Sequence, residues 1–250
     1  MVRSMSQDII AGRNPVLEAL RAGRTINKIF IASGARIGNL KEIYNLAKQN
    51  KVPVQNVERK YLDKIAGDAH QGIAAMASAK EYVDIDDLLD SVEGEPFLIL
   101  LDEIHDPHNL GAIIRTADAA GAHGVIIPQR RSVQLTATVS KASAGAIEHL
   151  PVSRVTNLVQ TIKKLQARGV WVVGADMDGA ELHWNSRLDG PIALVIGGEG
   201  KGLGRLVKES CDAVVRLPMA GKVNSLNASV AAAILTYEVV RQRDQGKRNA

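Results

Sequence analysis

The chain of 250 residues has a single cysteine, few aromatic side chains and no long apolar run. With only Cys211, the chain can form neither an intrachain disulfide nor a zinc site built from cysteines. The longest apolar runs, such as residues 97–101, reach five or six residues, whereas a membrane-spanning helix needs about 20. The first residues also lack the apolar segment of a secretory signal. We therefore expect a reduced, soluble protein of the cytoplasm that does not bind membranes.

Charge is unevenly distributed along the chain, although the whole sequence carries a formal net charge of only +4. Residues 1–80 carry a net charge of +7, residues 81–95 carry seven acids and no base, and residues 96–250 carry a net charge of +4. This pattern predicts a first domain over 1–80, an acidic linker over 81–95 and a second domain over 96–250. The basic first domain fits either an RNA-binding surface or a lysine-rich solvated surface. Its candidate phosphate contacts are Arg13, Arg36, Arg59 and Lys60.

Short apolar strands alternate with helical patterns in both predicted domains. The first domain reads as a small three-layer α/β unit with strands at residues 28–32, 52–57 and 73–77. In the second, apolar runs at 97–101, 125–127, 170–174, 192–196 and 213–217 alternate with helical patterns at 110–120, 158–165 and 228–240. This alternation predicts an α/β fold with a parallel sheet and helices on both faces. Ligands bind such sheets beyond the carboxyl ends of the strands, so the segments after residues 101, 196 and 217 are the candidate site.

The segment after residue 196 is rich in glycine and reads GGEGKGLG. Five glycines in eight residues indicate positive backbone angles or a close approach of other groups to the backbone. The order of Lys201 and Gly202 does not fit a Walker A loop, and the spacing fails the G-x-G-x-x-G pattern at Leu203 and Arg205. Glu199 would also repel a polyphosphate. The loop therefore favours a neutral or cationic ligand.

The segment after residue 101 reads DEIHDPHNLG and leads into a helix that carries Asn109 and Arg115. Taken alone, Asn109 is also explained as a helix cap and Arg115 as a surface cation. His105 and His108 lack a cysteine partner and are separated by a proline, so we expect no metal site.

The segment after residue 217 reads PMAGKVNSLNAS and precedes an alanine-rich helix. Ser225, Asn227 and Ser229 alternate around Leu226. A helix cap requires only one of these polar side chains. The other two are therefore available for a ligand.

Together, in this order and spacing, the three segments resemble the SpoU/TrmH family of RNA ribose 2′-O-methyltransferases. The matching stretches are DPHNLGAIIRTADAAG at residues 106–121, LVIGGEGKGL at 194–203 and LPMAGKVNSLNASVA at 217–231. HQGI at residues 70–73 resembles the end of the family's small RNA-recognition domain, so the resemblance covers nearly the whole chain. Within the family, the chain looks most like the bacterial enzymes that methylate a guanosine ribose of 23S ribosomal RNA.

The resemblance implies a parallel sheet whose C-terminal part, residues 197–204 and 217–229, is threaded into a deep trefoil knot. A small N-terminal α/β domain would bind RNA, S-adenosylmethionine would be the methyl donor, and two copies would form a homodimer. The implied cofactor contacts are Gly197, Gly198, Leu217, Met219 and Leu226. The implied catalytic residues are Arg115, Asn109, Glu199, Ser225 and Asn227.

Elementary chemistry agrees with that resemblance. A sulfonium cation with a neutral adenine has no use for a phosphate cradle, and it suits a glycine loop with one carboxylate beside Leu and Met side chains. A ribose hydroxyl is a poor nucleophile, so a cation beside it should stabilise the developing oxyanion. Since a guanidinium stays protonated in proteins, we expect Arg115 to stabilise charge and bind phosphate rather than act as a base.

Other functions remain open at this stage. A catalytically silent RNA-binding homologue would keep the fold, but the joint presence of the five implied catalytic residues favours an enzyme. A tRNA methyltransferase and an antibiotic-resistance methyltransferase of ribosomal RNA are alternatives within the enzyme class. Because only 3% of the residues are aromatic, shape and phosphate contacts should dominate RNA recognition over base stacking.

Overall fold

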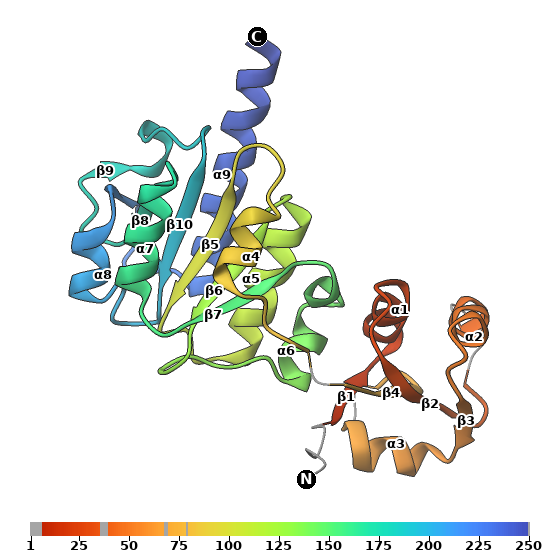
Figure 1. Ribbon diagram of the computed structural model, residues 1–250. Coiled ribbons are helices and arrows are strands. Elements are labelled where there is room, and N and C mark those ends of the chain that lie inside the picture. The colour runs from red at the N-terminus through yellow and green to blue at the C-terminus, as the bar shows by residue number, and fades with distance from the viewer. Residues whose placement is uncertain (1–6, 36–39, 68–69, 79, 250) are drawn as a thin grey trace. The chain divides into compact units, whose positions relative to one another are not determined.

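The computed structural model describes residues 7–35, 40–67, 70–78 and 80–249. Its contacts divide the chain into two compact units. The first unit comprises the chain up to Glu81 together with Leu135–His149, and the second comprises Tyr82–Gln134 and the chain from Leu150 onward. Figure 1 shows the elements of both. No helix in the described ranges has the length and apolar character needed to cross a membrane.

The first unit is built on a four-stranded sheet in the order β1-β4-β2-β3. Its strands are β1 (Gln7–Ala11), β2 (Ile26–Ala32), β3 (Val54–Val57) and β4 (Ile73–Ser78). Its N-terminal helices are α1 (Arg13–Arg21), α2 (Leu40–Gln49) and α3 (Arg59–Ala66). Apolar side chains of α1 and α2 pack with one face of the sheet, while Leu62 of α3 packs with Phe30 and Ala74 on the other. The predicted three-layer α/β unit is therefore present.

Residues 135–149 belong to the first unit, whereas their place in the sequence put them in the predicted second domain. They form α6 (Ala137–Ala142) and the 3₁₀ turn η1 (Ala146–Glu148). The buried carboxylate of Glu148 accepts a hydrogen bond from Arg24 at 2.6 Å, and His149 Nε2 lies 2.8 Å from Glu18. These charges, together with close packing of Gly145 on Glu18, attach the segment to the N-terminal residues.

The second unit contains a seven-stranded sheet in the order β7-β6-β5-β10-β8-β11-β9, and every pair of neighbours is parallel. The strands are β5 (Phe97–Asp102), β6 (Gly124–Pro128), β7 (Val152–Val155), β8 (Trp171–Ala175), β9 (Glu181–Leu182), β10 (Ile192–Gly197) and β11 (Ala213–Arg216). The helices are α4 (Ile85–Asp90), α5 (Pro107–Ala119), α7 (Leu158–Ala167), α8 (Arg205–Ser210) and α9 (Ala228–Asn249), with the 3₁₀ turn η2 (His183–Asn185). The prediction of an α/β fold with a parallel sheet is confirmed.

Helices cover both faces of this sheet. Side chains of α4, α7 and α8 pack with Leu98, Leu100 and Val195 in one core, while α5 and α9 pack against each other, with α9 also against β10. β10 is inserted between β5 and β8, so the carboxyl ends Asp102, Gly197 and Ala175 are neighbours at one edge. The segments after β5 and β10 are therefore adjacent, and the third segment follows β11, which pairs with β8.

Residues 82–95 of the predicted acidic linker belong to the compact second unit, and Glu81 belongs to the first. Leu88 and Leu89 of α4 are buried in the core, and Gly124 leaves space for Leu88. Asp86 forms ion pairs with Lys164 and Arg168 of the second unit. Three of the seven acids of the segment, Asp86, Asp87 and Asp90, thus lie on a helix whose apolar side chains are packed in the core.

Candidate active site

The three polar segments follow the carboxyl ends of β5, β10 and β11. Pro107 starts α5, and the side chain of Asp106 caps it by accepting a hydrogen bond from the amide of His108 at 2.8 Å. Because Asp106 supplies the cap, Asn109 is not needed for it. Asn109 is only 6% exposed, so its side chain points away from solvent and into the site.

Asn109, Glu199 and Asn227 form one hydrogen-bonded cluster. Asn109 Nδ2 donates to Glu199 Oε1 at 2.6 Å, and Asn227 Nδ2 donates to the same oxygen at 2.8 Å. Asn227 Nδ2 also lies 3.1 Å from Asn109 Oδ1. Three of the five predicted catalytic residues, one from each segment, therefore meet in the fold.

A fourth residue, Ser229, fixes the orientation of Asn227. Its hydroxyl and amide donate to Asn227 Oδ1 at 2.6 and 2.9 Å. Since Oδ1 is occupied in this way at the start of α9, Nδ2 is directed towards Glu199. The alternation of polar residues at 225, 227 and 229 is the sequence signal that pointed to this role.

The glycine-rich segment is a tight turn in which backbone approaches backbone. A Cβ on Gly197 would lie 2.3 Å from the carbonyl carbon of Gly202, and Gly202 itself has φ of +62°. Gly198 is equally confined, because a Cβ there would lie 2.5 Å from the carbonyl oxygen of Glu103. No other residue fits these positions without displacing main chain.

Two aspartates from neighbouring strand ends hold this turn. Asp102 at the end of β5 accepts from the amide of Gly204 at 2.8 Å, and Asp176 after β8 accepts from the amide of Leu203 at 3.3 Å. Burial raises the pKa of Asp102, and the amide of Gly204 opposes that shift. Partial burial would also raise the pKa of Asp176, but hydrogen bonds from Lys208 and two backbone amides outweigh it and lower the pKa. Neither aspartate was singled out from the sequence, because their role depends on which strands are neighbours.

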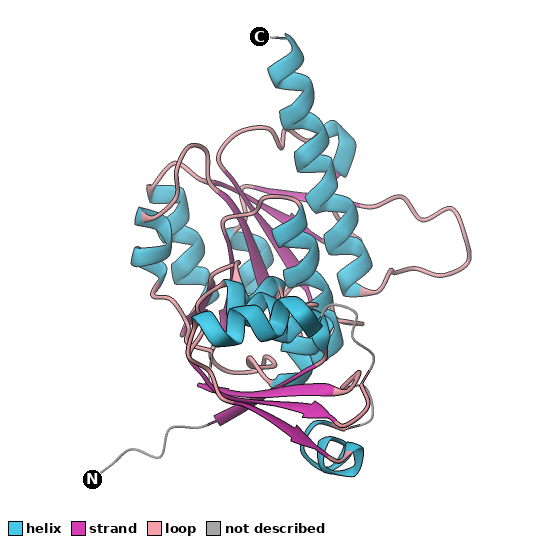
Figure 2. Cartoon of the chain, turned by 90° about the vertical axis from the view of Figure 1, so that its right-hand side faces the viewer, coloured by secondary structure: helices cyan, strands magenta, loops and turns pink. Residues whose placement is uncertain are grey.

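The third segment, residues 217–227, has no regular secondary structure and projects between β11 and α9 (Figure 2). Leu217 and Met219 are half-buried. Leu226 is 38% exposed, although it is apolar and lies one residue before Asn227. The segment therefore presents apolar side chains and backbone beside the polar cluster.

Arg115 and Ser225 do not join the cluster in this structure. Arg115 is exposed on α5 and makes no hydrogen bond or ion pair with another described residue. It follows Asn109 by six residues, which on a helix amounts to about 9 Å along the axis and roughly 120° around it. Ser225 is exposed in the projecting segment. The six-residue spacing on a helix thus accounts for the separation of Arg115 from Asn109, whereas no sequence pattern indicates the separation of Ser225.

The histidines, the cysteine and the described basic residues of the first domain lie outside the polar cluster. Among residues 7–35, 40–67, 70–78 and 80–249, no group of three or more His, Cys, Asp or Glu side chains is arranged to hold a metal ion. Burial raises the pKa of the Cys211 thiol to about 12, so it is protonated at neutral pH. Of the candidate phosphate contacts, Arg59 and Lys60 are exposed on α3 and Arg13 Nε donates to the carbonyl of Gln71. Arg36 lies outside the described residues.

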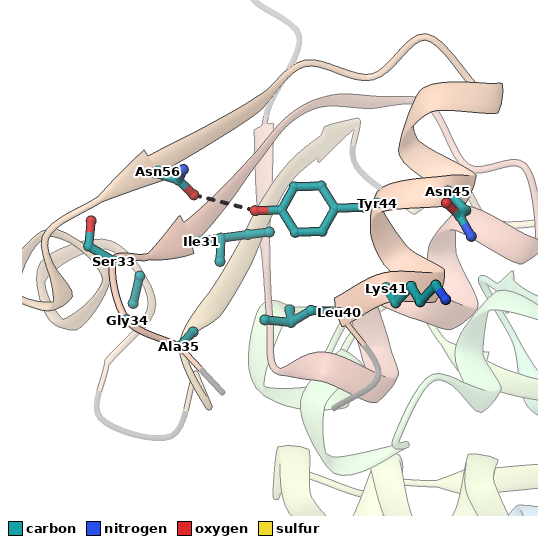
Figure 3. Close-up of a pocket in the computed structure, with 10 residues that line it drawn as sticks. Ile31, Ser33, Gly34, Ala35, Leu40, Lys41, Tyr44, Asn45 and Asn56 are labelled. Carbon is teal, nitrogen blue, oxygen red and sulfur yellow. Dashed lines mark hydrogen bonds between the residues drawn. The ribbon is translucent and has the colours of Figure 1, made fainter. Parts of the chain in front are cut away.

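The first unit has a hollow of about 550 Å³ between α2 and the strand ends (Figure 3). The ring of Tyr44 reaches from α2 towards Asn56 of β3, with the hydroxyl 3.4 Å from Asn56 Oδ1. Leu40 and the turn at Gly34 border the hollow below the ring. An aromatic ring beside an amide suits an unpaired base of RNA.

Comparison with known proteins finds families for both parts of the chain. A model described as the SpoU rRNA Methylase family matches residues 96–237. A second, described as RNA 2′-O ribose methyltransferase substrate binding, matches residues 9–83. The first match contains all three polar segments, and the second contains the N-terminal α/β sheet.

Relatives cover nearly the full length. The chain is 51% identical over 244 residues to the putative TrmH family tRNA/rRNA methyltransferase YacO of Bacillus subtilis, covering 96% of this chain and 98% of that protein. The SpoU methyltransferase AviRb from Streptomyces viridochromogenes, crystallised with AdoMet, has a TM-score of 0.83 and 27% identity over 96% of this chain and 92% of its own.

Two further solved structures differ in how much of the chain they match. An AdoMet-bound rRNA methyltransferase from Sinorhizobium meliloti has a TM-score of 0.79 and 27% identity, covering 94% of this chain and 87% of that one. A TrmH/SpoU tRNA modifying enzyme from A. aeolicus has a TM-score of 0.56 and 25% identity, covering 64% of this chain and 81% of that one. By sequence, by fold and by the segments that meet in its site, the chain belongs to the SpoU/TrmH family of S-adenosylmethionine-dependent RNA 2′-O-ribose methyltransferases.

Proposed function

We propose that this enzyme methylates the ribose 2′-hydroxyl of a guanosine in 23S ribosomal RNA. The observation that carries the proposal is the cluster of Asn109, Glu199 and Asn227, which joins all three family segments beside a glycine turn. We place the enzyme in the reducing cytoplasm, because a chain with one cysteine, Cys211, forms no intrachain disulfide.

The residues around the glycine turn fit S-adenosylmethionine. When bound, this cofactor supplies an electrophilic methyl group on a sulfonium cation. We assign its contacts to Gly197 and Gly198 in the turn and to the apolar side chains after β11, which are Leu217, Met219 and Leu226. Because its residues at 197 and 198 have no side chains, the turn leaves room for the cofactor beside it. Adenine bound there would cover the exposed side chain of Leu226. Family membership implies that these segments also form the deep trefoil knot.

The polar cluster and Arg115 have different roles towards the RNA, since the cluster orients the ribose and Arg115 stabilises charge. Asn109, Glu199 and Asn227 are held by one another and so provide fixed donors and acceptors for the ribose, which lowers the cost of orienting it. Ser225 is exposed two residues before Asn227 in the sequence. We propose that its hydroxyl binds the substrate phosphate or the cofactor carboxylate. Arg115 has its guanidinium free of any described partner and remains protonated, so it stabilises negative charge on the 2′-oxygen as the proton leaves to water or phosphate.

Ribosomal RNA is favoured over tRNA by the extent of the similarity. The S. meliloti rRNA methyltransferase matches 94% of the chain, including the first unit, whereas the A. aeolicus tRNA modifying enzyme matches 64%. The first unit matches the substrate-binding family and offers the hollow at Tyr44. A tRNA enzyme, a resistance methyltransferase of ribosomal RNA and a silent RNA-binding homologue are the alternatives.

A homodimer is supported by the surface of α9. Val230, Ile234 and Tyr237 are 46%, 39% and 51% exposed and follow one another at helical spacing on one face. Such a continuous apolar stripe is uncommon on a monomer, and a second copy of the chain would cover it. Exposed Arg115 lies on α5, the helix packed against α9, so an interface there would place this arginine beside the partner.

Replacing Gly197 by alanine should abolish or strongly weaken cofactor binding, because the new Cβ would force the turn open. Calorimetry with S-adenosylmethionine should show affinity lowered by about tenfold or more. Gly190→Ala is the matched control, since a Cβ there meets nothing within 4 Å. Equal affinities of the two variants would contradict the assignment of the turn to the cofactor.

Replacing Arg115 by alanine should lower methyl transfer to 23S ribosomal RNA by about 10²- to 10³-fold, because one stabiliser of the oxyanion is lost. Arg115→Lys should retain partial activity, since the positive charge remains. Arg205→Ala, which removes an exposed arginine paired with Glu209 on α8, is the control and should match the parent chain. Parental activity in Arg115→Ala, measured with labelled cofactor, would refute the catalytic role.

Replacing Ile234 by glutamate should convert a dimer into monomers, because two like charges would be buried in the α9 interface. Light scattering coupled to gel filtration would measure the mass of the parent and the variant. Leu206→Glu alters an exposed apolar residue on α8, 58% exposed against 39% for Ile234, and should leave the mass unchanged. A monomeric parent chain, or a dimeric Ile234→Glu variant, would contradict this interface.

A further inference from the structure

Three arginines line the carboxyl ends of β6 and β7, beside the strand that leads into the active site. Arg130 and Arg131 lie two and three residues after the end of β6, and Arg154 lies on β7 opposite Ile127 of β6. All three side chains are exposed. We call Arg130, Arg131 and Arg154 the arginine edge. No motif in the sequence includes any of them.

The turn that carries Arg130 and Arg131 is fixed to the segment after β5. The amide of Val133 and the hydroxyl of Ser132 donate to the carbonyl of Ile104 at 2.8 and 3.3 Å. Arg131 itself adopts a left-handed backbone with φ of +58°, as does Glu103 with φ of +57°. Because Ile104 precedes the capped start of α5 by only a few residues, the turn is held against the same segment that positions Asn109.

Glu103 links the arginine edge to the glycine turn. Its carboxylate lies 3.3 Å from Arg131 Nη1, and its carbonyl oxygen is so close to Gly198 that a Cβ there would lie at 2.5 Å. Arg131 nevertheless keeps 81% of its side chain exposed. The guanidinium is thus placed near the site while most of its donors remain available.

Arg154 is held in the same row by aromatic and amide contacts. Its guanidinium carbon lies 4.5 Å from the centroid of the Tyr82 ring, and Nη1 donates to Gln134 Oε1 at 3.4 Å. Gln134 Nε2 in turn donates to the carbonyl of Ser132, next to Arg131. No carboxylate within the described ranges forms an ion pair with Arg130 or Arg154. The row therefore has three cations against the single carboxylate of Glu103.

We propose that the arginine edge binds the phosphodiester groups of the RNA strand next to the methylated nucleotide. The inference rests on the proposed function, because it assumes that RNA lies over this edge of the sheet. Guanidinium groups match phosphate oxygens with paired N–H donors, and a rigid turn presents them without further ordering. These contacts position the strand, while Arg115 acts on the reacting ribose.

The test is the salt dependence of RNA affinity, measured by filter binding with a 23S transcript and no cofactor, over about 50 to 200 mM KCl. Each of Arg130→Ala and Arg154→Ala should weaken binding several-fold and reduce the slope of log affinity against log salt by about 0.7 to 0.9. Arg131→Lys should keep the parental slope, because it keeps the charge. Arg187→Ala is the matched control, since Arg187 is 86% exposed and sits before β10, at the opposite end of that strand.

The proposal that the arginine edge binds RNA is contradicted if Arg130→Ala and Arg154→Ala give the affinity and slope of Arg187→Ala. A merely structural role would lower the unfolding temperature without changing the slope, so thermal unfolding of the same variants completes the test. Because the binding assay contains no cofactor, it is independent of methyl transfer. Reduced slopes in a chain that transfers no methyl group would support the edge and contradict the proposed function. Methyl transfer by the parent chain, with the parental slope in Arg130→Ala and Arg154→Ala, would support the proposed function and contradict the arginine edge.

Discussion

One carboxylate oxygen, Glu199 Oε1, accepts hydrogen bonds from two amides that are far apart in sequence. Asn109 lies 90 residues before it and Asn227 lies 28 residues after it. Each amide belongs to a segment that follows a different strand, so this oxygen joins the three segments at one point. Every role assigned to the site depends on that meeting point, because the ribose and the cofactor must be presented to each other in a fixed geometry.

The shared oxygen is in place because the sheet and the glycine turn leave it little freedom. Insertion of β10 between β5 and β8 puts Gly197 beside Asp102, and the turn then folds back on itself at Gly202. Asp102 and Asp176 accept hydrogen bonds from successive amides of the turn. Glycine supplies the close approach, and the aspartates satisfy backbone donors that the turn would otherwise leave unpaired. The glycine turn is thus held by close backbone packing and by the two aspartates. The side chains that face the ligand are not needed to hold it.

The sequence predicts the elements of the second sheet well, because buried parallel strands are continuous apolar runs. The runs at 97–101 and 192–196 differ from β5 and β10 by one residue each. Strand β7 escapes the pattern because only four residues form it and two of them, Ser153 and Arg154, are polar. Helix α4 is not predicted because its acids suggest a solvated segment, although Leu88 and Leu89 are buried. The place of residues 135–149 in the first unit is not predicted either, because their charged side chains pair with residues more than a hundred positions away.

The site itself is predictable in composition but not in grouping. The motifs name Asn109, Arg115, Glu199, Ser225 and Asn227, yet the strand order decides that three of them meet. The helical geometry of α5 separates Arg115 from Asn109. Asp102, Asp176 and the arginine edge carry no motif signal, since each depends on which loops are neighbours in space.

The chemical position of the transferred methyl group tests the central claim most directly. Ribosomal RNA from a strain lacking this chain would be incubated with the enzyme and labelled S-adenosylmethionine, digested to nucleosides and separated by mass spectrometry. The account predicts label in 2′-O-methylguanosine from 23S RNA. Label on a base, or no label in RNA under conditions where the cofactor binds, would contradict it.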